Sequence, residues 1–158
     1  MLKSVLLVFV VTGYVIAESS CHTADGLYEV SIIGRSVVVI PGAGRRLVYD
    51  VTKTNEGNGY NRHTGVFTCP KTGIYVFTWV TRMCYSEHST ELMINNTIYG
   101  STFLRAKDGD DGSVSGTVVA HVSKGDTVYV RNQLIYGGDG RILSNVLGRT
   151  SFSGWLLQ

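Results

Sequence analysis

The segment of residues 73–83 constrains the fold more than any other part of this sequence. Two sets of apolar side chains alternate along it: Tyr75, Phe77 and Trp79 in one set, and Ile74, Val76 and Val80 in the other. Successive side chains of a β-strand point to opposite faces, so this strand would be apolar on both. Both apolar faces of this strand must then be covered by other parts of the protein or by a partner. We expect one face to lie in a sandwich core and the other at a subunit interface.

The remainder of the chain favours short strands and tight turns. No stretch shows sustained 3.6-residue periodicity, and nineteen glycines stand against two prolines. Asn95-Asn96 and Gly125-Asp126 suit two-residue hairpins because these residue types tolerate positive φ. An all-β sandwich or jelly roll of about ten strands follows. The expected strands are residues 27–33, 37–40, 46–51, 65–69, 73–83, 90–95, 97–104, 113–122, 127–134 and 150–157.

The first seventeen residues have the pattern of a secretory signal peptide. Lys3 precedes an apolar run at residues 5–11, and Ala17 ends a small-residue cleavage site. The apolar stretch is shorter than the roughly 20 residues that span a bilayer. We therefore predict a secreted, extracellular protein without membrane insertion, although an uncleaved N-terminal anchor is the alternative. Residues 18–23 form a short segment, and residues 24–158 form one domain.

Charge and motifs exclude several functions. The formal net charge is +2, and no stripe of Lys or Arg is present, so nucleic acid is not an expected partner. The sequence lacks the nucleophile elbow, the zinc-protease motif, the P-loop and the dinucleotide fingerprint. We predict a binding protein that is not an enzyme.

Aromatic, Asn and Gly residues recur at fixed spacings before and within residues 73–83: Tyr49, Asn55, Tyr60, Phe67, Gly73, Tyr75, Phe77 and Trp79. This pattern resembles the signature of the complement C1q globular-head family. The Ser151-Phe152-Ser153-Gly154-Trp155 run resembles the closing strand of that family. The match covers nearly the whole chain after residue 17 and is most similar to stalkless, secreted members.

The resemblance implies a ten-stranded, tumour-necrosis-factor-like jelly roll of two five-stranded antiparallel sheets, assembled as a homotrimer. Family members bind microbial surface glycans and lipopolysaccharide or cell-surface receptors, many hold calcium near the trimer apex, and none is known for catalysis. We therefore expect a lectin-like pattern-recognition protein of innate immunity. A cytokine-like or synaptic-organiser-like ligand for a receptor is the alternative, and a structural matrix protein is a third class.

One acidic segment is a candidate calcium site. Asp108, Asp110 and Asp111 lie within four residues, and no Lys or Arg follows Lys107 in this stretch. Carboxylate oxygens on a flexible, glycine-containing loop suit calcium, whereas the alternative is a solvated acidic turn. The family topology places this loop at the apex near residues 137–141. Asp139 and Arg141 in that segment are candidate ligand-binding residues.

Two further chemical features remain open in the sequence. Asn95-Asn96-Thr97 is a glycosylation sequon on a predicted turn, so Asn95 serves as a glycan acceptor, as a turn residue, or as both. Cys69 and Cys84 flank a strand whose ends lie roughly 35 Å apart, too far for a disulfide between them. In the family topology Cys84 lies near the base, where the N-terminus emerges, and Cys21 is its expected partner. An intermolecular Cys21 disulfide is the alternative.

Overall fold

The computed structural model describes residues 29–33 and 41–157. The predicted signal peptide and the expected strand at residues 37–40 lie outside these ranges. No helix among the described residues is long and apolar enough to cross a membrane. Within the described ranges the regular elements are nine strands: β1 (Glu29–Ile33), β2 (Val51–Asn55), β3 (Tyr60–Asn61), β4 (Val66–Thr68), β5 (Gly73–Ile94), β6 (Thr97–Val122), β7 (Thr127–Asn132), β8 (Asp139–Leu143) and β9 (Ser151–Leu156).

Two long strands, β5 and β6, belong to both layers of the fold. They pair antiparallel along almost their whole length. On its other edge β5 pairs with β9, then with β8, and finally with β7. The first half of β5 therefore lies in sheet one, with the order β2-β1-β9-β5-β6. Its second half lies in sheet two, with the order β3-β4-β7-β5-β6. Counting each half once gives five strands in each sheet, so the predicted jelly roll is confirmed.

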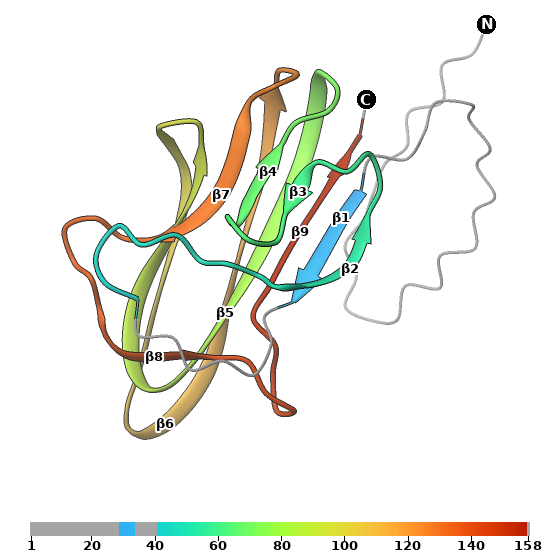
Figure 1. The fold of residues 1–158 in the computed structure, drawn as a ribbon. Helices are drawn as coiled ribbons and strands as arrows, with labels where there is room; N and C mark the ends of the chain where they lie inside the picture. The colour runs from blue at the N-terminus through green and yellow to red at the C-terminus, as the bar shows by residue number, and fades with distance from the viewer. Residues whose placement is uncertain (1–28, 34–40, 158) are drawn as a thin grey trace, which may run out of the picture.

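A bend turns the β5–β6 ribbon from sheet one into sheet two. In Figure 1 the two strands run side by side to a bend at the bottom of the view and then turn back upward. Tyr85 of β5 has a φ of 52°, and Asp108 and Gly109 of β6 have φ of 62° and 98°. Gly and Asp adopt this left-handed region readily, whereas a bulky Tyr rarely does. We call this end of the sandwich the bend end; it lies opposite the C-terminus.

Aromatic rings fill the space between the two sheets. Tyr75, Phe77 and Trp79 are at most 1 % exposed, as the alternation of residues 73–83 predicted. The indole Nε1 of Trp79 donates a hydrogen bond of 3.0 Å to Thr90 Oγ1 across the core. Phe77 also meets Phe67 of β4, in sheet two, at a centroid distance of 5.9 Å. These two contacts connect sheet one to sheet two.

The signature residues before β5 form one hydrogen-bonded corner. The Tyr60 hydroxyl donates to the Tyr49 carbonyl and accepts from the Tyr49 amide, both at 3.1 Å. Asn55 binds the backbone of Tyr60 through its side-chain oxygen and nitrogen, each at 3.0 Å. Burial raises the pKa of Tyr60 to about 12, so the phenol stays neutral as this dual donor and acceptor. The spacing of these residues is therefore a packing requirement.

Two expectations about strands are wrong. The strand expected at residues 46–51 is reduced to a single bridge from Arg46 to Arg131, and β2 begins at Val51 instead. The reason is that the Tyr60 hydroxyl occupies both backbone groups of Tyr49. Strand β8 was not expected, because its sequence begins with Asp and Gly and has no alternating apolar pattern.

Candidate functional site

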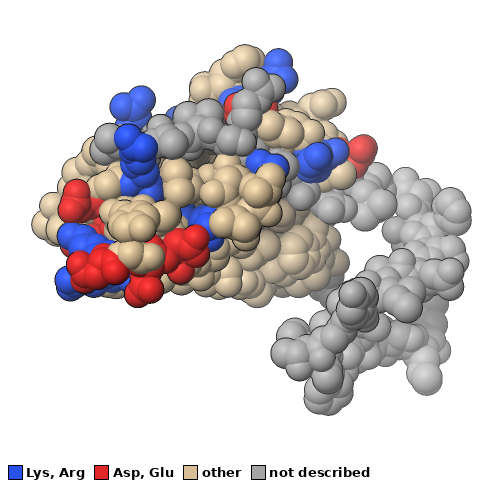
Figure 2. Space-filling view, turned by 90° about the horizontal axis from the view of Figure 1, so that it is seen from below, with Lys and Arg blue, Asp and Glu red and all other residues tan. Residues whose placement is uncertain are grey.

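The bend end brings together segments that are far apart in the sequence. Cys84 of β5 pairs with Asp111 of β6 on one side and with Arg141 of β8 on the other. The expectation that residues 108–112 and 137–141 are neighbours is therefore confirmed. Seen from this end, acidic and basic side chains gather on one side of the molecule (Figure 2).

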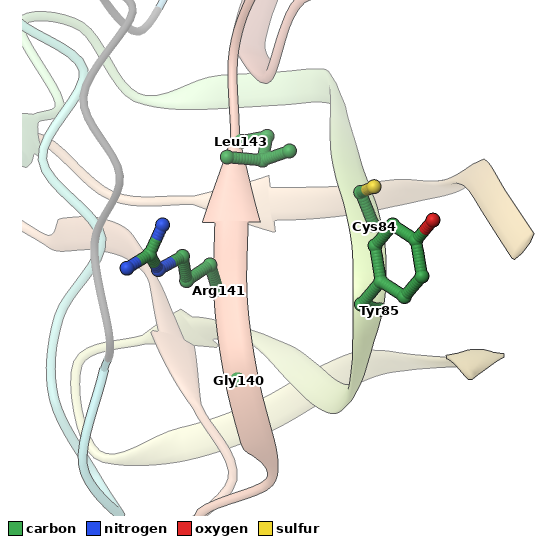
Figure 3. A pocket seen from close by; sticks show the side chains of 5 residues that line it. All are labelled: Cys84, Tyr85, Gly140, Arg141 and Leu143. Atoms are coloured by element: carbon green, nitrogen blue, oxygen red, sulfur yellow. The ribbon is translucent and has the colours of Figure 1, made fainter. Parts of the chain in front are cut away.

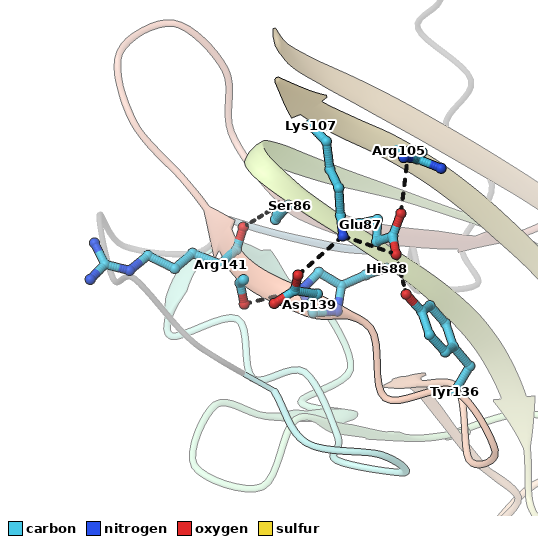
Figure 4. A network of polar contacts seen from close by, with 9 residues as sticks. Ser86, Glu87, His88, Arg105, Lys107, Tyr136, Asp139 and Arg141 are labelled. Carbon is cyan, nitrogen blue, oxygen red and sulfur yellow. Dashed lines mark hydrogen bonds and ion pairs between the residues drawn. The ribbon is translucent and has the colours of Figure 1, made fainter. Parts of the chain in front are cut away.

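Glu87 is the centre of a polar network at the bend end (Figure 4). Its carboxylate accepts from the Tyr136 hydroxyl and lies 3.3 Å from Lys107 Nζ and 3.5 Å from Arg105 Nε. Lys107 also binds Asp139 at 3.1 Å. The Tyr136 hydrogen bond, followed by Lys107, lowers the pKa of Glu87. The hydrogen bond to Asp139, followed by that to Glu87, raises the pKa of Lys107, so both groups are charged at neutral pH.

The acidic segment lies on the bend of β6, where Asp111 has a cationic partner. Arg82 of β5, only 4 % exposed, binds both oxygens of Asp111 at 3.3 and 2.5 Å. The expectation that no basic side chain neutralises this segment is therefore wrong, because the partner comes from the adjacent strand. The described residues contain no group of three or more His, Cys, Asp or Glu side chains that could hold a metal ion. The calcium site of Asp108, Asp110 and Asp111 therefore remains a prediction.

The two candidate ligand-binding residues have different surroundings. Asp139 is held by Lys107 within the network. Arg141 extends away from β8, and its backbone carbonyl accepts from Ser86 Oγ at 2.8 Å (Figure 4). Arg141 also lines a pocket of about 320 Å³ together with Cys84, Tyr85, Gly140 and Leu143 (Figure 3).

No pattern in the sequence identifies several residues of this site. Glu87, Lys107 and Arg82 are single charges whose partners lie on other strands, so linear spacing does not reveal them. His88 belongs to no recognisable motif, and it is 1 % exposed. Its Nε2 lies 3.2 Å from the Gly140 carbonyl oxygen, beneath the start of β8. The β5–β6 register brings Arg82 to Asp111 and Glu87 to Arg105 and Lys107, whereas the contacts of His88 and Lys107 with residues 139–140 depend on the unexpected strand β8.

The position of Cys84 in the fold differs from the one expected from the family topology. Cys69 and Cys84 are free thiols, separated by the first half of β5. Cys84 lies at the bend end, whereas β1 begins with Glu29 opposite Trp155, near the other end of sheet one. The expectation that Cys84 lies where the N-terminal segment emerges is therefore wrong. Cys21 lies outside the described residues, and its pairing with Cys84 remains a prediction.

Asn95 connects two hairpins at the end opposite the bend. Its Nδ2 donates to Asp126 Oδ1 at 3.0 Å, and its Oδ1 accepts from the Thr127 amide at 2.9 Å. Asn95 has a φ of 52°, as expected for the two-residue turn. The turn role is thus confirmed, and glycosylation of Asn95 remains a prediction.

Replacing Asn95 with aspartate should lower the melting temperature by about 3–6 °C at pH 7. The substitution removes the donor to Asp126 and puts a second carboxylate beside it. The Asn95 hydrogen bond lowers the pKa of Asp126 from 3.8, so this contribution is present above pH 3.8 and is lost as the pH falls through the lowered value. Thermal unfolding from pH 7 to pH 2 should show the two proteins converging in acid. Asn96→Asp, at the exposed neighbouring position, is the control; an equal loss for both variants contradicts the prediction.

The outer face of sheet one is a second candidate surface. Val119 of β6, Val76 of β5 and Trp155 of β9 are in register across it. Val119 is 63 % exposed and Trp155 40 % exposed. Soluble monomers rarely expose contiguous apolar patches, and such patches mark interaction sites. We call the exposed set the apolar patch: Ile74, Val119, Trp155 and Leu157.

Comparisons with known proteins agree with this architecture. Residues 33–157 match the family model of the C1q domain. Caprin-2 of Danio rerio is 30 % identical over 115 residues, which are 70 % of this chain and only 12 % of Caprin-2. The globular domain of zebrafish complement 1qA protein superposes with a TM-score of 0.68 at 17 % identity, covering 82 % of this chain and 97 % of that one. Murine APRIL at pH 5.0 gives a TM-score of 0.64 at 11 % identity, covering 84 % and 100 %. The solved structures share the fold with this chain.

Proposed function

This chain belongs to the C1q-domain family, and from that premise we propose that it is a secreted, homotrimeric, lectin-like protein that binds glycans or lipopolysaccharide on microbial surfaces. Domains of this fold commonly trimerise, and the family is typically non-enzymatic. The observation that supports glycan binding most directly is the Glu87 network. It presents charged, hydroxyl and aromatic groups together on an exposed part of the bend end.

The chemistry of the Glu87 network suits a polyol. Sugar hydroxyl groups both donate and accept hydrogen bonds, and the network places acceptors beside donors. The side chains of Arg105 and Asp139 are 64 % and 71 % exposed, so hydrogen-bonding capacity remains for a ligand. The ring of Tyr136, which is 44 % exposed, adds an apolar surface beside them. A few polar groups next to an aromatic ring are typical of ligand sites.

Trimer formation through the apolar patch would make this weak site effective. Three copies related by a three-fold axis carry three equivalent bend ends. When ligands repeat on a cell surface, linked sites gain avidity that one site lacks. The patch lies on sheet one, whereas Glu87 and Lys107 lie beyond the bend, so assembly and ligand binding use different surfaces.

Binding of the secreted protein to whole bacteria, compared with host cells whose glycans have been removed, tests the proposal. We expect binding to bacteria that falls at least about tenfold in Glu87→Gln, because loss of the charge disconnects Lys107 and Arg105. Glu56→Gln, at an exposed position outside the bend end, is the matched control. Strong binding to the stripped host cells with none to bacteria would instead support a receptor ligand of the cytokine-like class.

A further inference from the structure

The pocket at the bend end has apolar walls and one cationic residue at its rim. Cys84 and Leu143 contribute apolar groups, Tyr85 contributes its ring, and Gly140 and Arg141 of β8 complete the lining (Figure 3). The volume of about 320 Å³ is at the lower end of the roughly 300–1,000 Å³ range of small-molecule sites. It suits one sugar ring or a group of that size.

A β-bulge creates this pocket and exposes the Tyr85 ring. Cys84 pairs with Arg141 and Glu87 with Asp139, so two residues of β5 stand opposite the single residue Gly140. Tyr85 takes a φ of 52° there and is 68 % exposed. The other non-glycine residues with positive φ are Asn or Asp, which tolerate it. Bulges redirect side chains near functional sites, and a bulky residue kept in this conformation suggests a use for its ring.

Among the residues that the structure describes, Arg141 is the only basic one that lines the pocket. The nearby carboxylates are engaged elsewhere: Asp139 with Lys107, Glu87 with the network, and Asp111 with Arg82. In Figure 3 the guanidinium points away from Cys84 and Tyr85, and rotation about the side-chain bonds of this exposed arginine allows it to reach a ligand at the rim. A planar guanidinium pairs with a carboxylate through two parallel hydrogen bonds.

We infer that this pocket binds an acidic sugar that carries a compact methyl-bearing substituent, with the carboxylate on Arg141 and the apolar part against Tyr85 and Leu143. This inference rests on the proposed function, since it names the ligand class of the same end of the molecule. Three features favour such a ligand over a neutral sugar or a simple acid. They are the positive charge of Arg141, which has no ion-pair partner within the described ranges, the apolar walls and the exposed ring.

Calorimetric titration of the full-length protein with three monosaccharides tests the inference. N-acetylmuramic acid carries the carboxylate and the methyl groups, N-acetylglucosamine lacks the carboxylate, and galacturonic acid lacks the methyl groups. We expect N-acetylmuramic acid to bind at least about tenfold more tightly than either of the others. Arg141→Gln should remove that preference, and Tyr85→Asn, which keeps a residue that tolerates the φ, should weaken binding while the fold is retained. Arg149→Gln, an exposed arginine outside the pocket, is the control.

The thiol of Cys84, which lines the pocket, provides a second measurement of ligand binding. In protein whose Cys84 is kept reduced, bound ligand should slow the alkylation of Cys84 by iodoacetamide, whereas Cys69, at 1 % exposure, should stay unreactive with or without ligand. If N-acetylmuramic acid binds equally to wild type and Arg141→Gln and leaves Cys84 unprotected, the site lies elsewhere and the inference is overturned. If no acidic sugar binds while bacterial binding persists and depends on Glu87, the pocket inference fails and the proposed function stands. If the wild-type protein does not bind bacteria at all, the proposed function itself is contradicted.

Discussion

Replacing Trp79 with alanine should lower the free energy of unfolding by about 4 kcal/mol, the largest stability effect that we expect from one substitution in this chain. Trp79 is 1 % exposed and lies between the two sheets. An added Cβ on Gly116 would come within 2.3 Å of the indole, so the backbone of β6 packs directly against the ring. The neighbouring strands cannot collapse into the vacated space without breaking their register, and a cavity remains.

Loss of the indole also removes a hydrogen bond inside the core. Thr90 Oγ1 would keep contacts of 2.8 Å to Thr102 Oγ1 and 3.3 Å to Thr81 Oγ1, so the cost is chiefly that of the cavity. Urea unfolding at one fixed protein concentration gives the measurement, because assembly makes apparent stability depend on concentration. Phe103→Ala, which truncates an aromatic side chain that is 56 % exposed, is the control and should cost less than about 1 kcal/mol. Equal losses in the two variants would show that Trp79 does not pack as described.

The sequence predicted the core well because alternation and aromatic spacing are local patterns. Residues 73–83 had to be a strand covered on both faces, and the aromatic face is indeed the centre of the core. The merging of four expected strands into β5 and β6 was not foreseen. It depends on left-handed conformations at Tyr85, Asp108 and Gly109, and of these the Asp-Gly pair is compatible with such a conformation in a sequence, whereas Tyr85 gives no indication of it.

The candidate site was predicted less well because its partners come from strands distant in sequence. The acidic segment was visible, yet its neutralising residue Arg82 lies 29 positions before Asp111 and meets it only through the β5–β6 register. Arg141 was identified as a candidate, whereas the Tyr85 ring that forms the pocket with it was not. That ring is exposed by a bulge opposite β8, a strand without an apolar pattern. Charge density in the sequence therefore predicted a metal site, but it could not reveal the ion pairs and the pocket that the strand registers bring together.

Replacing Val119 with aspartate should convert the proposed trimer into folded monomers. Val119 lies in the apolar patch, in register with Val76 and Trp155 across the outer face of sheet one. In a trimer that buries this patch, each copy would place an unpaired carboxylate in an interface. A cost of roughly 2 kcal/mol at each of three interfaces weakens assembly about ten-thousandfold or more. The fold of one copy should survive, because Val119 is 63 % exposed and outside the core.

Sedimentation velocity at micromolar concentration, with circular dichroism to confirm the fold, measures this effect. The wild type should sediment with three times the mass of one chain, and Val119→Asp with the mass of one. Ile135→Asp is the matched control, because Ile135 is an aliphatic residue that is 90 % exposed in the β7–β8 connection, outside the patch. Its variant should remain trimeric. A trimeric Val119→Asp protein, or a monomeric wild type, would show that the apolar patch is not the surface that joins the copies. Because binding to bacteria is proposed to depend on avidity, the monomeric variant should also lose that binding while its affinity for a soluble monosaccharide stays unchanged.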